Sequence, residues 1–342
     1  MGRFKVLACL AVMLPLIGVM EGQSSSDRHV WLPFKVYRGY VLVVEGSIGG
    51  VPHRKLLIDT AAYPSVIDQD LARKLHLSST SDELRVVGQN LKSEAAVVPL
   101  VQVGPVEARN LSVQVQDLHG IEKKLGTHVD ALIGLDVLGQ SSFRIDYEQQ
   151  QLVFGAVGVL QASAPLKQID RMTYVDTELN GQVAHLLVGS AASNITVFGN
   201  VASKMRVAET KQLESTNLGG KVSLRQVHID RLAVGGVDLG PREIQVTDSE
   251  NLRTLPVDGL LSTGALGFGQ VAFDFDHQVF SWEMAGKARN HTTALRGPRA
   301  TNTGLPPIEG SDPMSTVASG CPSLQGSAGN CRSAAPRPQQ PR

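Results

Sequence analysis

The sequence predicts an all-β protein built from two homologous lobes with a cleft between them. From about Trp31 to Met284, short apolar runs rich in valine alternate with glycine, asparagine, aspartate and proline, which is the pattern of many short strands. Only two stretches in this region, 67–77 and 198–205, have the apolar spacing of helices. A chain of 342 residues is also long enough for two units of ordinary domain size.

An internal repeat predicts that the two lobes are homologous. Three blocks of sequence recur in the same order and at nearly the same separation. The blocks pair 46–67 with 177–198 after a gap of one residue, 103–115 with 234–246, and 129–154 with 257–282. Because chance does not produce three ordered matches of this kind, the sequence predicts two copies of one β unit of roughly 120 residues.

The N-terminal residues resemble an export signal. Arg3 and Lys5 precede an apolar run, Val6 to Met20, which small and polar residues follow. The run is shorter than the roughly 20 residues that a membrane-spanning helix needs. We therefore expect residues 1–23 to be a signal peptide, the chain to be exported to a periplasm or secreted, and no integral membrane segment to remain after the signal is removed.

The rest of the chain divides into two lobes and a tail. The first repeat predicts a lobe over residues 30–158, and the second predicts a degenerate lobe over residues 165–286. Residues 287–342 are rich in proline, serine and glycine and lack apolar periodicity, so we expect a disordered tail. Cys321 and Cys331 lie in this tail, and we assign them no catalytic role.

The charge balance excludes several classes of partner. Lys plus Arg and Asp plus Glu each number 32, so the chain has no net field to attract nucleic acid or anionic lipid. The nine histidines include no pair at the spacing of a metal site such as H-E-x-x-H. We therefore expect no nucleic-acid partner, no metal and no other cofactor.

The stretch LLIDTAAYPSVI contains the one acid that we expect to be functional. Residues 56–58 predict a buried strand that ends at Asp59, and residues 60–62 predict a tight turn of small side chains that a neighbouring lobe can approach closely. Ser65 is expected to be the N-cap of the helix that follows. Further on, the hairpin within about 84–98 is expected to cover the cleft.

This stretch resembles the active-site motif of aspartic proteases of the pepsin and retropepsin type, apolar-apolar-Asp-Thr followed by Gly, Ser or Ala and then Ala. ALIG, residues 131–134, is similar to their second motif, two apolar residues and a glycine beneath the active-site loop. Its setting, VDALIGLDVL, is especially similar to the retropepsin-like enzymes of bacteria. The resemblance implies a bilobal acid-protease fold, with two retropepsin-like β-barrel lobes in one exported chain.

The resemblance also implies a function, an aspartic endopeptidase that hydrolyses peptides or unfolded proteins in the cleft. Aspartic proteases are themselves the standard example of two aspartates, about 3 Å apart, that share one proton. The ionised one deprotonates water while the protonated one donates a hydrogen bond to the peptide carbonyl. The residues that match the family's motifs are the catalytic Asp59, the turn residues Thr60 and Ala61, and the supporting Leu132, Ile133 and Gly134.

The second copy departs from this pattern, since HLLVGSAASNITVF puts Gly189 opposite Asp59. A lone exposed aspartate has a pKa near about 3.9 and serves at neutral pH as a base but not as an acid. Three interpretations stay open. In the first, two chains pair through their first lobes, although the second lobe then obstructs the pairing surface. In the second, Asp59 works within one chain with another partner, such as Ser190 or a water. In the third, the protein is an inactive pseudoprotease that binds peptides or a partner.

Overall fold

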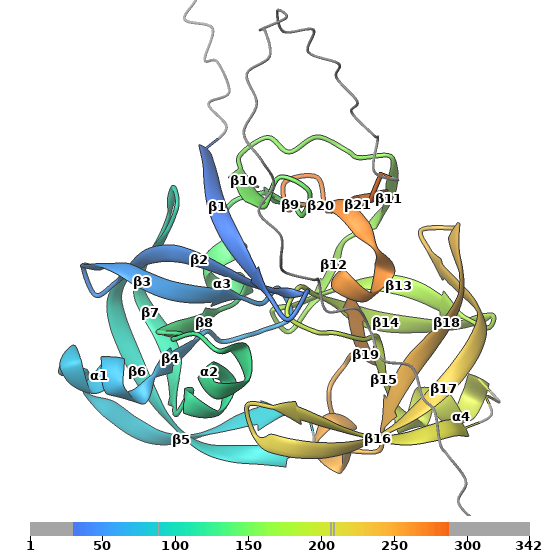
Figure 1. Cartoon of the computed structure of the whole chain (residues 1–342), viewed down its shortest axis with the longest axis horizontal. Helices are drawn as coiled ribbons and strands as arrows, with labels where there is room; N and C mark the ends of the chain where they lie inside the picture. Colours follow the sequence, from blue (N-terminus) through green and yellow to red (C-terminus); the bar gives the residue numbers. More distant parts are fainter. Residues whose placement is uncertain (1–29, 88, 206, 208, 287–342) are drawn as a thin grey trace, which may run out of the picture. The chain divides into compact units, whose positions relative to one another are not determined.

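The computed structural model describes residues 30–286 except 88, 206 and 208, and within them the protein is all-β with few helices (Figure 1). This confirms the predicted fold class. The predicted signal peptide, 1–23, and the predicted tail, 287–342 with its two cysteines, lie outside the described residues. No helix among the described residues is both long and apolar enough to cross a membrane.

The first repeat forms ten strands and three short helices. The strands are β1 (Val30–Tyr37), β2 (Val41–Ile48), β3 (Val51–Ile58), β4 (Val66–Asp68), β5 (Ser79–Val86), β6 (Gln89–Val103), β7 (Val106–Gln116), β8 (Ala131–Ile133), β9 (Phe143–Asp146) and β10 (Gln151–Phe154). The helices are α1 (Gln69–Lys74), α2 (His119–Leu125) and α3 (Leu135–Leu138).

The second repeat follows a similar order, with one strand more and with 3₁₀ turns in place of two of the helices. Its strands are β11 (Ala162–Pro165), β12 (Lys167–Ile169), β13 (Met172–Leu179), β14 (Gln182–Gly189), β15 (Thr196–Phe198), β16 (Glu209–Asn217), β17 (Gly220–Val234), β18 (Val237–Thr247), β19 (Gly259–Ser262), β20 (Phe268–Asp274) and β21 (Val279–Met284). Its helices are α4 (Gly199–Met205) and two 3₁₀ turns, η1 (Glu250–Leu252) and η2 (Gly264–Leu266).

The strands form two sheets that repeat the same connections. One has 13 strands in the order β11-β21-β20-β9-β10-β1-β2-β3-β8-β4-β7-β6-β5, and the other has eight in the order β12-β13-β14-β19-β15-β18-β17-β16. β3 pairs in parallel with β8 in the first repeat, and β14 pairs in parallel with β19 in the second. Two sheets with matching topology are consistent with the two predicted lobes.

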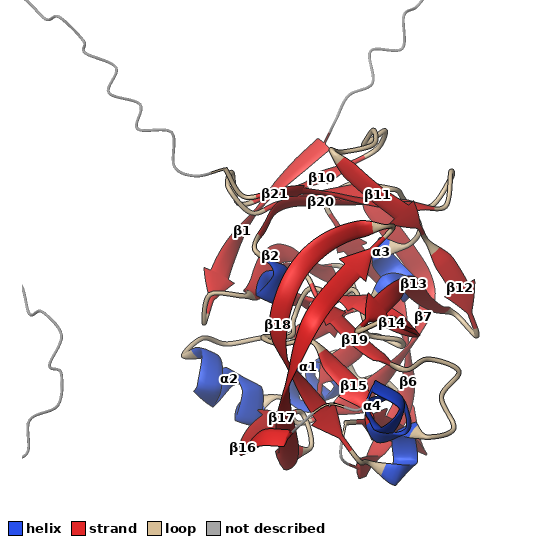
Figure 2. Cartoon of the chain, turned by 90° about the vertical axis from the view of Figure 1, so that its right-hand side faces the viewer, coloured by secondary structure: helices blue, strands red, loops and turns tan. Residues whose placement is uncertain are grey.

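Six antiparallel strands join the two repeats, three from each, in the order β11-β21-β20-β9-β10-β1 (Figures 1 and 2). At the centre, β9 pairs with β20 and Arg144 lies opposite Ala272. The sequence repeat also aligns these two residues with each other. A residue paired with its own counterpart marks a local twofold axis, which passes through this strand pair.

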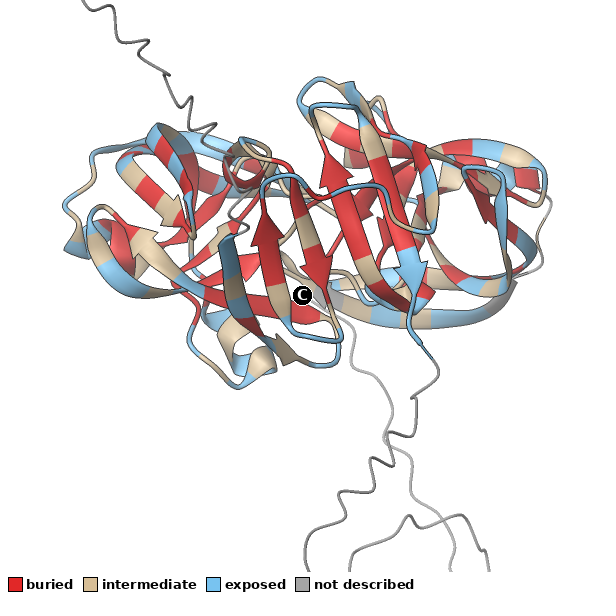
Figure 3. Ribbon diagram, turned by 90° about the horizontal axis from the view of Figure 1, so that it is seen from above, coloured by how far each residue is buried: buried red, intermediate tan, exposed pale blue. Residues whose placement is uncertain are grey.

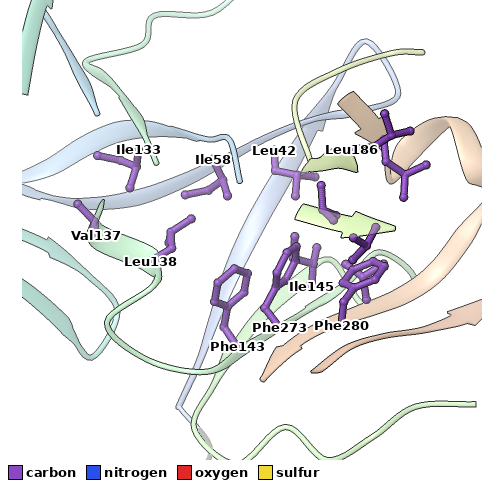
Figure 4. Close-up of a cluster of buried hydrophobic side chains, with 14 of the residues drawn as sticks. Leu42, Ile58, Ile133, Val137, Leu138, Phe143, Ile145, Leu186, Phe273 and Phe280 are labelled. Carbon is purple, nitrogen blue, oxygen red and sulfur yellow. The ribbon is translucent and has the colours of Figure 1, made fainter. Parts of the chain in front are cut away.

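The core runs from this joining sheet towards both lobes. Phe143 and Phe273 stack with ring centroids 4.8 Å apart, and Phe280 packs on Phe273 at 5.3 Å (Figure 4). Ile58 and Ile133, at the ends of β3 and β8, are 1% exposed and belong to the same apolar cluster. Buried positions accordingly extend through the strands of both repeats (Figure 3). The strand that leads to Asp59 is thus anchored in the core.

The two predicted helices are present, but the first begins differently from the prediction. The stretch 67–77 contains α1 over Gln69–Lys74, and 198–205 contains α4 over Gly199–Met205. The prediction of Ser65 as the N-cap is wrong, because the short strand β4 separates Ser65 from the helix. Asp68 caps α1 instead, and its carboxylate accepts a hydrogen bond from the Asp70 amide at 2.9 Å.

Candidate active site

Asp59 lies directly after β3, at the point where the first lobe meets the second. Its amide donates to the Ile133 carbonyl at 3.0 Å, which continues the parallel pairing of β3 with β8 by one residue. The chain then turns, and the Ala62 amide donates to the Asp59 carbonyl at 3.1 Å. The buried strand and the tight turn predicted around Asp59 are both present.

The turns of the two lobes are interlocked by reciprocal hydrogen bonds. The Thr60 hydroxyl donates to the Val188 carbonyl at 2.6 Å, and the Ser190 hydroxyl donates to the Ile58 carbonyl at 3.0 Å. The Thr60 amide in turn donates to the Ser190 hydroxyl at 3.2 Å. Thr60 and Ser190 are both fully buried. Each turn therefore holds the other in register, and Asp59 and Gly189 occupy equivalent positions across the junction.

The Asp59 carboxylate is partly buried and has few stabilising contacts. Its Oδ1 accepts a hydrogen bond from the Ala61 amide at 3.0 Å. No cation forms an ion pair with it among the described residues. Burial raises the pKa of Asp59 above its ordinary value of 3.8, and the Ala61 amide offsets only part of this effect. The pKa of Asp59 is therefore higher than that of a lone exposed aspartate.

Gly189 leaves the position opposite Asp59 without a side chain. A Cβ built on Gly189 lies 3.3 Å from the Cβ of Ala61 and meets no backbone atom within 4 Å. The Gly189 carbonyl accepts from the Thr263 amide at 3.1 Å, and the Thr263 hydroxyl bonds to Tyr147 at 2.6 Å. Burial raises the pKa of this Tyr147 hydroxyl to about 12, so it stays protonated. Hydrogen bonds through Thr263 and Tyr147 thus hold the Gly189 backbone in place, and none of these groups is a carboxylate.

Ser190, the predicted alternative partner of Asp59, and three other aspartates of the two lobes have bonding partners of their own. The Ser190 hydroxyl donates its proton to the Ile58 carbonyl and accepts from the Thr60 amide, so its proton is not available to Asp59. The Asp258 carboxylate accepts from the His185 amide at 2.9 Å, and Asp130 accepts from the Lys55 amide in the same way in the first lobe. Asp248 pairs with Arg225. Asp59 is the one acidic residue among the described residues that line the cleft.

The apolar-apolar-glycine motif supports the Asp59 turn from below. Leu132 and Ile133 pair with β3, and a Cβ on Gly134 would lie 2.3 Å from the Ala62 carbonyl oxygen. Only glycine allows this approach. In the second lobe Ser262 stands at the equivalent position, and its hydroxyl donates to the Ala192 carbonyl at 2.6 Å. The altered residue therefore still fixes the turn.

One support of the first-lobe turn was missed in the sequence. Asp136 follows Gly134 by two residues, and its carboxylate accepts from the Ser65 amide at 2.7 Å and from the Ser65 hydroxyl at 2.5 Å. The Ser65 hydroxyl itself accepts from the Gly134 amide at 2.9 Å. Asp136 thus ties the exit of the active-site turn to the glycine beneath it, which explains the second aspartate of VDALIGLDVL.

A cleft of about 760 Å³ opens at Asp59 between the two lobes. Its walls are mostly apolar. The first lobe contributes leucines and an isoleucine, Leu57, Leu84, Ile121, Leu125 and Leu132, and the second contributes Leu187, Leu218, Leu252, Leu255 and Leu260. A mostly apolar cleft with a convergent carboxylate has the character of a ligand-binding site.

Two hairpins, one from each lobe, contribute residues to the lining of the cleft, and their strands β5 and β16 lie at the same side of the molecule in Figure 1. The hairpin of β5 and β6 is the predicted one, whereas the hairpin of β16 and β17 was not predicted. Their tips are joined, since the Asn217 and Gln89 side-chain amides donate to the Val87 and Gly219 carbonyls respectively. The Asn251 amide adds a bond to the Val86 carbonyl at 2.8 Å. The two hairpins that line the cleft are therefore bonded to each other at their tips.

One group of side chains among the described residues has the spacing of metal ligands. Oxygen and nitrogen atoms of Asp68, Asp117 and His119 lie within 4.8 Å of one another. The two Asp68 oxygens already accept hydrogen bonds from the Asp70 and Leu118 amides, and His119 Nδ1 bonds to Asp117 at 2.6 Å. These bonds account for the group, which does not line the cleft, and we assign no metal to it.

Comparison with known proteins adds a family to this geometry. Residues 44–137 match the family model described as aspartyl protease. The match includes Asp59, its turn and the glycine motif, while the second repeat lies outside it. No curated protein sequence matches the chain.

Proposed function

We propose that the chain, whose residues 44–137 match the aspartyl protease family model, is a retropepsin-like peptide hydrolase that works with a single catalytic aspartate, Asp59. Its substrate is an extended peptide or an unfolded protein bound in the interlobe cleft. The observation that supports the proposal is the pair of interlocked turns, which holds Asp59 in the lining of the cleft although Gly189 stands at the equivalent position of the second lobe.

The proposed reaction uses Asp59 twice. Ionised Asp59 takes a proton from a water molecule, the resulting hydroxide attacks the peptide carbonyl, and protonated Asp59 then gives the proton to the leaving nitrogen. The products are a carboxylic acid and an amine, and no covalent intermediate forms on the enzyme. What the site lacks is a second, protonated carboxyl that donates a hydrogen bond to the carbonyl oxygen while the first is ionised.

This deficiency sets the expected rate. General acid catalysis is worth roughly 10²- to 10⁴-fold, which corresponds to a barrier higher by about 3 to 5 kcal/mol when it is lost. We therefore expect turnover slower by this factor than in a site with two aspartates.

The direct test incubates the full chain and its Asp59→Asn variant with an unfolded, carboxymethylated protein, and identifies the fragments by mass spectrometry. The Asp70→Asn variant is the control, since Asp70 lies outside the cleft on α1. We expect cleavage by the wild type and by the control and none by Asp59→Asn. Equal fragment yields from all three chains would remove Asp59 from the reaction and refute the proposal.

A second function is favoured by Gly189, which removes the acid that the two-aspartate mechanism needs. In this case the protein is a pseudoprotease that binds extended peptides in the closed cleft without cutting them. Saturable binding of a peptide by both the wild type and Asp59→Asn, without fragments after long incubation, would support this second function over the first.

The proposed setting is outside the cytoplasm, on the basis of the predicted signal peptide. Fusion of residues 1–23 to a reporter enzyme that is active only after export tests this part of the proposal.

A further inference from the structure

Each lobe contains a row of three residues that are paired across three neighbouring strands (Figure 1). The rows are Leu132, Val66 and Gln114 on β8, β4 and β7 of the first lobe, and Leu260, Thr196 and Gln245 on β19, β15 and β18 of the second. Residues paired across a sheet point to the same face of it. The two rows are therefore structural counterparts, and they can be compared residue by residue.

In the first lobe, the row presents only apolar side chains to the cleft. Leu132 and Val66 line the cleft, whereas Gln114 lies outside the lining and is 7% exposed. The Gln114 side-chain amide donates to Asp82 Oδ2 on β5 at 2.7 Å. The amide group of this glutamine is thus bound within its own lobe and is not offered to a ligand.

In the second lobe, the row presents two polar side chains to the cleft. Thr196 and Gln245 are half-buried and both line the cleft, while their neighbours Val197 and Val246 are buried in the core. Among the described residues, neither the Thr196 hydroxyl nor the Gln245 side-chain amide has a hydrogen-bond partner. Polar groups that lie in a mostly apolar cleft without a partner in their own chain are available to a ligand.

The two groups together match a side-chain carboxamide. The Gln245 amide offers both donors and an acceptor, and the Thr196 hydroxyl offers a donor and acceptor sites. A carboxylate uses only the donors of such a pair, and an ammonium uses only the acceptors. An asparagine or glutamine side chain uses both kinds at once, so it leaves fewer polar groups of the cleft unpaired when water is excluded.

We propose that Thr196 and Gln245 form a carboxamide-binding subsite on the second-lobe wall, so that the cleft selects peptides with an asparagine or glutamine beside apolar residues. The inference rests on the proposed function, in which the cleft binds peptides. Leu260, the third member of the row, pairs with Thr196 and also lines the cleft. It supplies an apolar surface for the aliphatic part of the same side chain.

The test measures peptide binding to the full-length Asp59→Asn chain, in which no cleavage is expected, by isothermal titration calorimetry. A set of apolar peptides carries glutamine, methionine, glutamate or lysine at one position in turn, since methionine has the length of glutamine without its amide. We expect one position at which glutamine binds about tenfold more tightly than methionine, as one or two net hydrogen bonds predict. Glutamate and lysine at this position should both bind less tightly than glutamine.

Variants of the subsite, made in the same Asp59→Asn chain, supply the decisive comparison. Thr196→Val, which gives the second row the valine of the first, and Gln245→Met should each abolish most of the preference for glutamine. Gln212→Met is the matched control, because Gln212 is an exposed glutamine on β16 outside the cleft lining, and it should leave the preference unchanged. Binding of the methionine peptide to all three variants shows that they are folded.

The outcomes distinguish the subsite from the function beneath it. Equal binding of the glutamine and methionine peptides at every position, or a preference that survives in Thr196→Val or Gln245→Met, would overturn the subsite while peptide binding stands. Glutamate that binds as tightly as glutamine would show that the two groups act only as donors, which would overturn the assignment to a carboxamide. Failure of every peptide to bind would overturn the proposed function and the subsite with it.

Discussion

Burial destabilises the ionised form of the Asp59 carboxyl, and this makes the ionised form a stronger base. Burial raises its pKa, so the ionised form accepts a proton more readily than an exposed aspartate does. The same shift affects folding. The folded chain holds the Asp59 proton more tightly than the unfolded chain, so between pH 3.8 and the raised pKa the folded state binds more protons and stability falls as pH rises.

The Asp59→Asn variant should therefore be more stable than the wild type at pH 7. Asparagine cannot ionise, so the variant does not lose stability when the pH rises through the Asp59 titration. The two melting temperatures should converge below about pH 3.8, where Asp59 is protonated in both states. Thermal denaturation of both chains from pH 3 to 8 measures the difference, and a less stable variant at neutral pH would contradict the burial argument.

Gly189 is the residue at which a second acid can be restored. A Cβ at this position needs the Ala61 methyl group to yield by a few tenths of an ångström and meets no backbone atom. We expect Gly189→Asp to share a proton with Asp59 and to raise kcat/KM by roughly 10²- to 10⁴-fold. Its pH profile should become bell-shaped, whereas the wild type should rise with pH to a plateau.

Gly189→Asn is the matched control, since it adds the same volume without an acid. A rate increase shared by both variants would show that packing, and not a second carboxyl, limits the wild type. No increase in Gly189→Asp would show that the interlocked turns do not bring the two side chains together.

At the scale of the elements, the glycine beneath the turn is the most constrained position. Gly134→Ala places a methyl group 2.3 Å from the Ala62 carbonyl oxygen, and backbone must move to relieve the overlap. We expect a loss of about 1 to 3 kcal/mol in the free energy of unfolding and loss of any Asp59-dependent activity. Gly120→Ala is the control, because a Cβ there meets nothing within 4 Å. Urea titration of both variants measures the difference.

The two hairpins act as one cover because their tips are bonded. Asn251→Ala removes the bond to the Val86 carbonyl and a second bond to the Asn90 side chain. We expect faster amide hydrogen exchange in β5 and the start of β6, and faster peptide association, because the cover must open to admit a chain. Asn200→Ala on α4, which does not line the cleft, should change neither rate. Unchanged exchange in Asn251→Ala would show that the hairpins open independently of this bond.

For the whole molecule, the second lobe occupies the surface through which two first lobes could pair. The Thr60 and Ser190 hydroxyls bond within the chain, and the joining sheet is completed by β20, β21 and β11 of the same chain. We therefore expect a monomer by light scattering and activity proportional to protein concentration. Activity that rises with the square of concentration, together with the mass of a dimer, would favour pairing of two chains through Asp59.

Much of this architecture was predictable because the sequence contains an internal repeat, so that each element is indicated by two separate stretches of the chain. The apolar runs predict the strands, and the repeat predicts that Asp59 and Gly189 face each other, as the interlocked turns show. Contacts between distant residues were not predictable. The Asp136 carboxylate bonds Ser65 only because β8 brings them together, and the second hairpin was overlooked because its sequence, 209–234, is polar and shares little with the first.

The difference between Asp59 and Gly189 has a consequence for the orientation of a peptide bound in the cleft. A cleft with perfect twofold symmetry presents the same groups to a peptide whichever way it runs, so it has no preferred polarity. Here the first-lobe wall carries Asp59 and residues of α2, while the second-lobe wall carries Leu252 of η1 and, among the described lining residues, no acid. A peptide bound in one orientation therefore contacts different side chains from the same peptide bound in the opposite orientation. We therefore expect a bound peptide to prefer one of its two orientations in the cleft.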